Sequence, residues 1–149
     1  MKRNILFAAL CLTLTLPLAA CAAKEPSAPL VIDAAALGAE PTFIDHTHRG
    51  VAMQLIAIKD ADDTVRLALN TCQSCGGSPY AWFEYVGDDT LQCQNCGLTF
   101  NTATVGTPKA AGCNPVTVGD FTVEGDTVTV PDSVLASAKG LFTNWKAVD

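Results

Sequence analysis

Short apolar segments separated by polar turns run through the chain after residue 40, and most are typical of β-strands. Residues 51–59 are largely apolar, while residues 64–70 alternate between apolar and polar side chains with a period of two. The polar residues 60–63 lie between them, so the two segments predict an antiparallel hairpin. Similar patterns predict further short strands at residues 42–45, 81–86, 90–92, 121–123 and 127–130.

Near the C-terminus the pattern changes to that of one short helix. Residues 131–133 are typical of a helix start, and residues 139–140 of a helix end. The apolar side chains of residues 141–145 are expected to fold back onto the core. The chain of 149 residues is long enough for one domain and a targeting segment. We therefore predict a mainly β fold, a small single domain with a short C-terminal helix.

The N-terminus has the order of regions found in a signal peptide. Lys2 and Arg3 precede an apolar stretch at residues 5–18 that is too short to span a bilayer comfortably. Small residues then lead to Cys21, which resembles the lipobox of bacterial lipoproteins. We predict a signal peptide at residues 1–20 and a lipidated Cys21; the alternative is an ordinary signal peptide with an incidental cysteine. An Ala-, Pro- and Ser-rich tether would follow at residues 21–40, and the Cys-rich metal-binding domain at residues 41–149.

The charge of the chain limits its partners. The formal net charge is −6, and removal of residues 1–20 leaves seven basic and fifteen acidic residues, a net charge of −8. Such a surface disfavours nucleic acids and anionic lipid head groups. We expect an acidic domain held at the extracytoplasmic face of a cell membrane by its lipid anchor, in the periplasm if the host has two membranes.

Four cysteines form the most informative motif. Cys72 and Cys75 make one Cys-x-x-Cys pair, Cys93 and Cys96 make another, and 17 residues separate the pairs. Each pair is followed by a glycine, which would let the turn adopt a positive φ, and backbone N–H groups of such turns can point at the sulfurs. Both turns are flanked by predicted strands. This pattern predicts a four-thiolate metal site on zinc-ribbon or rubredoxin-like turns at β-hairpins.

The spacing alone does not choose the metal, because zinc and iron sites both use four thiolates. A disulfide exchanger would need a helix after its Cys-x-x-Cys pair, and haem attachment would need histidine where Gly76 and Gly97 stand. Cys113 is either a further sulfur at the centre or a buried free thiol. His46 and His48 are either a second metal site or two surface histidines.

The motif cysteines and their neighbours together resemble the FtrD-like family of membrane iron–sulfur proteins, formerly a domain of unknown function found in bacterial iron-transport loci. The matching residues are Val65–Ala68, Cys72, Cys75, Cys93, Asn95–Gly97, Phe100 and Gly112–Pro115. The resemblance implies that Cys72, Cys75, Cys93, Cys96 and Cys113 serve an iron–sulfur cluster or mononuclear iron centre. It also implies electron transfer in iron transport, with a membrane iron permease or another redox protein as partner.

We accordingly expect an accessory electron-transfer lipoprotein. No nucleophile–base pair or paired-carboxylate site is evident in the sequence, so it gives no support for hydrolytic catalysis. The alternative is a structural zinc-binding β module that mediates protein–protein interaction without redox activity.

Overall fold

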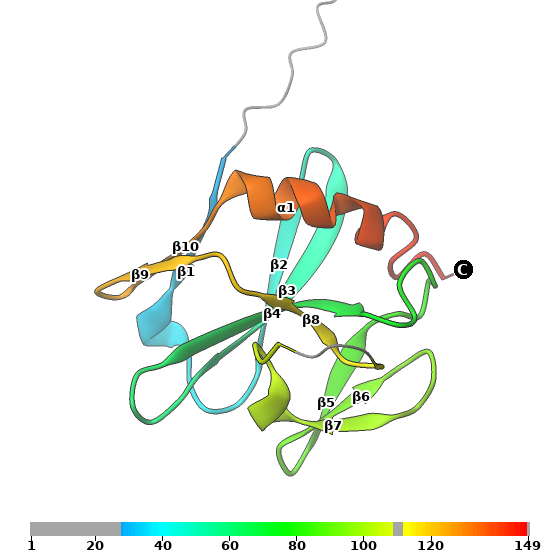
Figure 1. Cartoon of the computed structure of the whole chain (residues 1–149), viewed down its shortest axis with the longest axis horizontal. Helices are drawn as coiled ribbons and strands as arrows, with labels where there is room; N and C mark the ends of the chain where they lie inside the picture. Colours follow the sequence, from blue (N-terminus) through cyan, green and yellow to red (C-terminus); the bar gives the residue numbers. More distant parts are fainter. Residues whose placement is uncertain (1–27, 109–111, 149) are drawn as a thin grey trace, which may run out of the picture.

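The computed structural model describes residues 28–108 and 112–148, which form three antiparallel sheets (Figure 1). The central sheet has the strand order β2-β3-β4-β8. Its strands are β2 (Thr42–His48), β3 (Val51–Lys59), β4 (Val65–Cys72) and β8 (Pro115–Val118). The predicted β3–β4 hairpin is confirmed, with Ile56 opposite Ala68 in its register.

Two smaller sheets and one short helix complete the described fold. The second sheet, of order β1-β10-β9, consists of β1 (Leu30–Asp33), β10 (Thr127–Val130) and β9 (Thr122–Glu124). The third, of order β5-β6-β7, consists of β5 (Phe83–Gly87), β6 (Thr90–Cys93) and β7 (Thr99–Asn101). Helix α1 (Asp132–Ala138) is followed by a 3-10 turn at Lys139–Phe142, and other 3-10 turns lie at Ala34–Ala36 and Thr102–Thr104. These elements confirm a mainly β fold with a short C-terminal helix.

The central sheet is buried on both faces, which explains why β3 is largely apolar, with Gln54 as the polar residue in its buried stretch. Leu55 and Leu67 point into one apolar cluster, the first core, which packs against α1 and the β1-β10-β9 sheet. Ile56 and Ala68 point into another, the second core, which packs against the β5-β6-β7 sheet. In Figure 1 the helix and the β5-β6-β7 sheet accordingly lie on opposite sides of the central strands.

The first core contains hydrocarbon and aromatic side chains and no cysteine. Its members from the second sheet and the helix include Val128, Val130 and Leu135, each fully buried. The expected return of the C-terminal segment is confirmed, because Phe142 is buried there and Trp145 packs against the same cluster.

The boundary predicted between tether and domain is wrong. Residues 30–37 belong to the folded domain, because Leu30 and Ile32 are buried in the first core and β1 pairs with β10 along its whole length. Four-residue strands such as β1 carry too little periodicity to stand out from an Ala- and Pro-rich context. The predicted signal peptide, Cys21 and the start of the tether lie outside the described residues.

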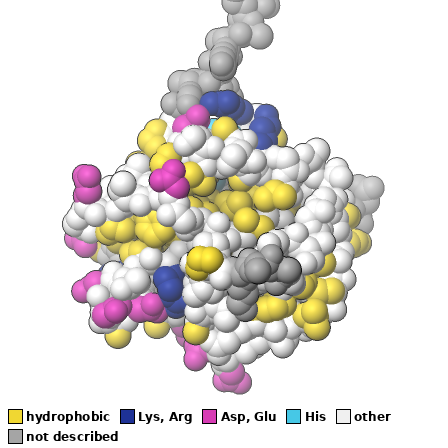
Figure 2. All heavy atoms as spheres, viewed as in Figure 1, with side chains coloured by type: hydrophobic (Ala, Val, Ile, Leu, Met, Phe, Trp, Pro, Cys, Tyr) yellow, Lys and Arg dark blue, Asp and Glu magenta, His cyan; other side chains and the backbone are white. Residues whose placement is uncertain are grey.

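The start of α1 also differs from a capped helix. Pro131 occupies the cap position and offers no side-chain hydrogen bond. The Asp132 carboxylate instead accepts a hydrogen bond of 2.8 Å from the Arg49 guanidinium, which ties the helix to the β2–β3 turn. Among the described residues, no helix is both long and apolar enough to cross a bilayer. Figure 2 shows acidic side chains along the left and lower edges of one face and few basic ones, in keeping with the negative net charge.

Candidate metal centre

Strand register brings Cys72 and Cys113 together. Cys72 is the last residue of β4 and lies opposite Pro115, the first residue of β8. Cys113 precedes that proline by two residues, so the β4–β8 pairing delivers it to the end of β4. The connection is fixed on both sides, since Gln73 N–H donates to the Asn114 carbonyl and the Asn114 amide donates to Gln73 Oε1.

One short segment, residues 81–83, positions both Cys turns. The Cys72 N–H donates to the Ala81 carbonyl, and the Gln94 N–H donates to the Trp82 carbonyl. Phe83 then pairs with Cys93 in the β5–β6 register. The two turns are thus attached to opposite sides of the same few residues, which places their sulfurs close together although 17 residues separate the pairs.

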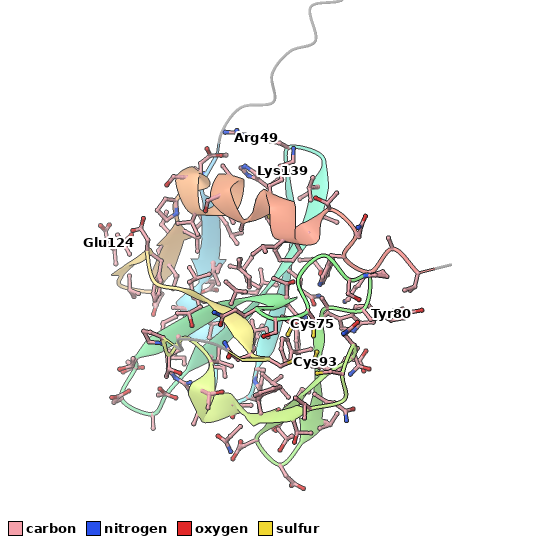
Figure 3. The ribbon with its side chains drawn as sticks, turned by 45° about the vertical axis from the view of Figure 1, so that its right-hand side comes forward. Arg49, Cys75, Tyr80, Cys93, Glu124 and Lys139 are labelled. Carbon is pink, nitrogen blue, oxygen red and sulfur yellow. The ribbon has the colours of Figure 1, made fainter. Side chains whose placement is uncertain are left out.

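Cys113 lies at the middle of the sulfur cluster. Its Sγ is 3.0 Å from Cys72 Sγ, 3.0 Å from Cys96 Sγ and 3.8 Å from Cys75 Sγ. The sulfurs of Cys72, Cys75, Cys93 and Cys113 all lie within 4.8 Å of one another. Figure 3 shows Cys75 and Cys93 close together near the middle of the domain, whereas Arg49 and Lys139 lie at its top.

The structure therefore brings together all five cysteines singled out in the sequence. They differ in burial and in how close their sulfurs lie to one another. Cys72 and Cys93 are fully buried in the second core, and Cys75 and Cys113 are half-buried against it. Cys96 is exposed and lies outside the mutually close group of four. The sequence pattern had favoured the two Cys-x-x-Cys pairs as the four ligands. In the structure the four sulfurs closest to one another include Cys113 and leave out Cys96.

Backbone N–H groups point at the sulfurs, as expected for such turns. Cys75 N–H donates to Cys72 Sγ at 3.4 Å, and the N–H groups of Asn95 and Cys96 stabilise the Cys93 thiolate. The expected glycine conformation is confirmed at Gly97, with φ +71°. At the first turn it is wrong by one residue, since Gly77 rather than Gly76 takes the positive φ, of +89°.

Burial raises the pKa of three of the thiols. It raises the pKa of Cys93 to about 12, against the opposing effect of its N–H donors. Burial is also the largest cause of the raised pKa of Cys75 and of Cys113. The pKa of the exposed Cys96 is lowered, chiefly by its hydrogen bond with Cys113 and then by the Leu98 N–H. A metal ion binding here must displace thiol protons, so its affinity rises with pH.

The buried side chain of Asn70 connects β4 to β5 next to the cysteine cluster. Its Nδ2 donates to Gln54 Oε1 at 2.7 Å and to the Phe83 carbonyl at 3.1 Å, and its Oδ1 accepts from the Phe83 N–H at 2.7 Å. The Asn70 carbonyl accepts from the Trp145 indole at 2.7 Å. The side chain thus attaches β5 to β4 where the strands diverge. Sequence reasoning gave Asn70 no such role, although a polar amide within an apolar strand is a usable signal.

A second contact joins the two Cys turns directly. Ser78 Oγ donates to Asn95 Oδ1 at 2.6 Å, across from the first turn to the second. A hydrogen bond from the Asn95 side chain opposes the effect of burial on the pKa of Cys75. Asn95 therefore both connects the turns and stabilises negative charge on a neighbouring sulfur.

His46 and His48 share one face of β2, with ring centroids 6.1 Å apart. Describing both as surface histidines is wrong for His48, which is buried with its Nε2 3.6 Å from Asp132 Oδ1. Burial, and then the neighbouring His48, lowers the pKa of His46. Within residues 28–108 and 112–148, the mutually close metal-ligand group is the cysteine group, and no third ligand joins the histidines within the same distance.

The donor set fits a single soft metal ion. A tetrahedral site with metal–sulfur bonds of about 2.3 Å places its sulfurs about 3.8 Å apart. The Cys75–Cys113 separation is 3.8 Å, and the four sulfurs lie within 4.8 Å of one another. The Cys72–Cys113 separation, 3.0 Å, is shorter than that edge, so these two sulfurs would have to move apart on binding. A cluster containing inorganic sulfide holds its cysteines further apart, because several metal ions and sulfides lie between them. Burial of Cys72 and Cys93 and the N–H donors provide the dry, polarised surroundings typical of thiolate centres.

The comparison with protein families places this arrangement in context. Residues 39–142 match the family described as membrane iron-sulfur containing protein FtrD-like. The match covers more than half of the chain, so the chain belongs to the FtrD-like family of iron–sulfur containing membrane proteins. A search of curated proteins found no match, and neither did a search of solved structures. Together, the family and the cysteine cluster indicate metal binding in an iron-related context.

Proposed function

We propose that this chain is an extracytoplasmic lipoprotein that holds one iron ion through Cys72, Cys75, Cys93 and Cys113 and exchanges electrons with a membrane partner in iron transport. The observation that carries the proposal is the group of four thiol sulfurs within 4.8 Å of one another in a member of an iron–sulfur family. The lipobox-like residues before Cys21 support the lipid anchor.

When bound to thiolates, iron changes between two oxidation states and thereby takes up or releases one electron. The chain's residues set the conditions for that exchange. The second core excludes water from Cys72 and Cys93, which lowers the local dielectric constant. The N–H groups aimed at Cys72 and Cys93 stabilise negative charge on sulfur and so favour the reduced state. The exposed Cys96, beside Cys113, marks the side on which a redox partner comes nearest to the centre.

The partner is a membrane iron permease or a redox protein associated with one. A mature chain with a net charge of −8 associates fastest with a partner whose docking surface is basic. A lipid on Cys21 would confine the domain to the membrane surface, which raises its effective concentration near such a partner.

The test is metal and acid-labile sulfide analysis, with a visible spectrum, on mature protein purified without oxygen. One iron per chain, no sulfide and absorbance that bleaches on reduction would support the proposal. Iron with stoichiometric sulfide would overturn the single-ion centre and leave electron transfer standing. Zinc without colour, even after anaerobic reconstitution with iron, would overturn the redox function.

The second candidate is a zinc-stabilised binding module. The closed set of four thiols, two of them fully buried, favours it, because structural zinc sites have four protein ligands and no open position. Such a module would dock a partner and transfer no electrons. A redox titration separates the two, because zinc in proteins has one oxidation state.

A further inference from the structure

Five thiols converge where a tetrahedral site takes four, and Cys113 is the thiol with two alternative roles. It belongs to the mutually close group with Cys72, Cys75 and Cys93. Its Sγ also lies 3.0 Å from the Sγ of Cys96, which is outside that group. Cys72 Sγ is equally close to Cys113, at 3.0 Å, but Cys72 is fully buried. A sulfur in a disulfide is no longer a thiolate and cannot bind the metal as one, so the two roles exclude each other.

Exposure gives the two sulfurs different access to other molecules. Cys96 is exposed, whereas Cys113 is half-buried and Cys93 is fully buried. A disulfide approaching from solution therefore meets Cys96 first. Disulfides within the Cys-x-x-Cys pairs would close small strained loops, whereas a bond between Cys96 and Cys113 closes a longer one.

We propose that Cys96 and Cys113 form a reversible disulfide that withdraws Cys113 from the metal site, so that metal retention depends on the thiol–disulfide state of the compartment. The proposal rests on the ligand set given under the proposed function. Extracytoplasmic compartments are oxidising, so a thiol pair placed in this way would meet suitable oxidants there.

The chemistry is thiol–disulfide exchange with an external disulfide, either a small molecule or an exchange protein. The Cys96 sulfur attacks that disulfide, forms a mixed disulfide and releases one thiol. The Cys113 sulfur then attacks Cys96 Sγ and releases the second thiol. In the metal-loaded chain the Cys96 S–H bond and the bond between Cys113 and the metal ion are broken, and one protein S–S bond forms. The two electrons end on the two sulfurs of the reduced oxidant, one of which takes the Cys96 proton while the other takes a proton from water. Three cysteines then remain at a site that needs four, and the ion leaves.

The experiment uses the mature chain loaded anaerobically with Zn²⁺ and then treated with oxidised glutathione. Peptide mass mapping follows disulfides, and a chromogenic chelator follows released Zn²⁺. We expect a Cys96–Cys113 disulfide to appear at the rate at which Zn²⁺ is released, and a dithiol to restore binding. A first disulfide between any other pair, or release without a disulfide, would overturn the proposal.

Three variants make the test specific. Cys96→Ser should bind Zn²⁺ when reduced and release it about tenfold more slowly under oxidised glutathione, because the entry thiol is missing. Val123→Ser, a change of an exposed side chain on β9, should release Zn²⁺ at the wild-type rate. Cys113→Ser should bind Zn²⁺ weakly even when reduced. Loss of reduced-state binding in Cys96→Ser would make Cys96 a ligand and overturn the proposal.

The proposed function and this inference can fail separately. A wild-type chain that binds neither iron nor zinc would end the proposed function. Disulfide mapping of that same chain would still report whether Cys96 pairs with Cys113 first, which supports or refutes the pairing by itself.

Discussion

The two cores of this protein share one sheet but are built from different groups. The first core consists of aliphatic and aromatic side chains such as Leu55, Leu135 and Phe142. The second is smaller, contains Cys72 and Cys93, and faces a sheet whose strands have three to five residues. The first core buries more apolar side chains than the second, whereas the second would gain stability from metal–sulfur bonds of its cysteines. We infer that the first core can stay folded when loss of the metal lets the second core unfold.

Metal removal should have the largest effect, and it should destabilise the second core more than the first. Structural zinc in small domains contributes on the order of 10 kcal/mol to folding. We expect chelation under reducing conditions to abolish hydrogen-exchange protection in β5, β6 and β7 while β3 and β10 stay protected, measured by exchange mass spectrometry. Equal loss of protection in all three sheets would show that the two cores form one cooperative unit.

Truncation in the first core should be costly whether or not metal is bound. Leu135 is fully buried there, so Leu135→Ala should lower the free energy of unfolding by about 2–5 kcal/mol in urea melts. Val31, which is 61 % exposed, provides the control, since Val31→Ala should change it by less than about 0.5 kcal/mol. If Leu135→Ala lowered the free energy of unfolding only in metal-loaded protein, the two cores would not be independent.

The buried amide should matter for the second core. Asn70→Leu leaves the Phe83 N–H without its acceptor and should cost about 1–3 kcal/mol. It also removes the 2.7 Å donor to Gln54 Oε1, which keeps only the 3.5 Å contact from Lys146 Nζ. We expect the variant to weaken metal affinity as well, because Phe83 positions the strand opposite Cys93. Thr99→Ala, at an exposed position of β7, is the control. Weakened stability with unchanged metal affinity would make Asn70 a feature of the fold alone.

The smallest effect concerns a partly exposed ion pair that attaches a loop of the second core. Arg66 donates to Asp60 at 2.7 Å and to the carbonyls of Thr102 and Val105. The hydrogen bond from Arg66 lowers the pKa of Asp60 below its ordinary value. The ion pair therefore stabilises the folded state at pH values above the ordinary pKa of an aspartate. This stabilisation is lost as the pH falls through the lowered pKa of Asp60 in the folded protein.

Urea melts from pH 6 down to pH 3 would measure this contribution, which for an exposed pair is about 0.5 kcal/mol. Asp60→Asn should remove the pH-dependent part and leave the rest of the profile unchanged. An identical acid dependence in the variant would assign it to other carboxylates.

Local patterns predicted several elements and the main motif. The β3–β4 hairpin, β10 and α1 followed from periodicity and turn residues, and the approach of Cys72 to Cys93 followed from paired Cys turns. Long-range pairing could not be predicted in this way. Strand β8 has four residues and is recognisable only through its register with β4, and that register is what places Cys113 among the sulfurs. The ligand roles of the five cysteines stay predictions.

Two further differences have the same origin. Leu30 and Ile32 look like tether residues until β10 pairs with them. His48 looks exposed until α1 covers it and brings Asp132 to within 3.6 Å. In each case a partner distant in the sequence decides burial, and a window of ten or fifteen residues does not contain it.

The pairing of β1 with β10 has a mechanical consequence. A pull transmitted through the residues before Leu30 enters the domain along β1 and is resisted in shear by its hydrogen bonds to β10. From there it spreads into the first core, on the face of the central sheet away from the cysteines. Tension on the N-terminal segment would therefore strain the first core and leave the geometry of the sulfurs undisturbed.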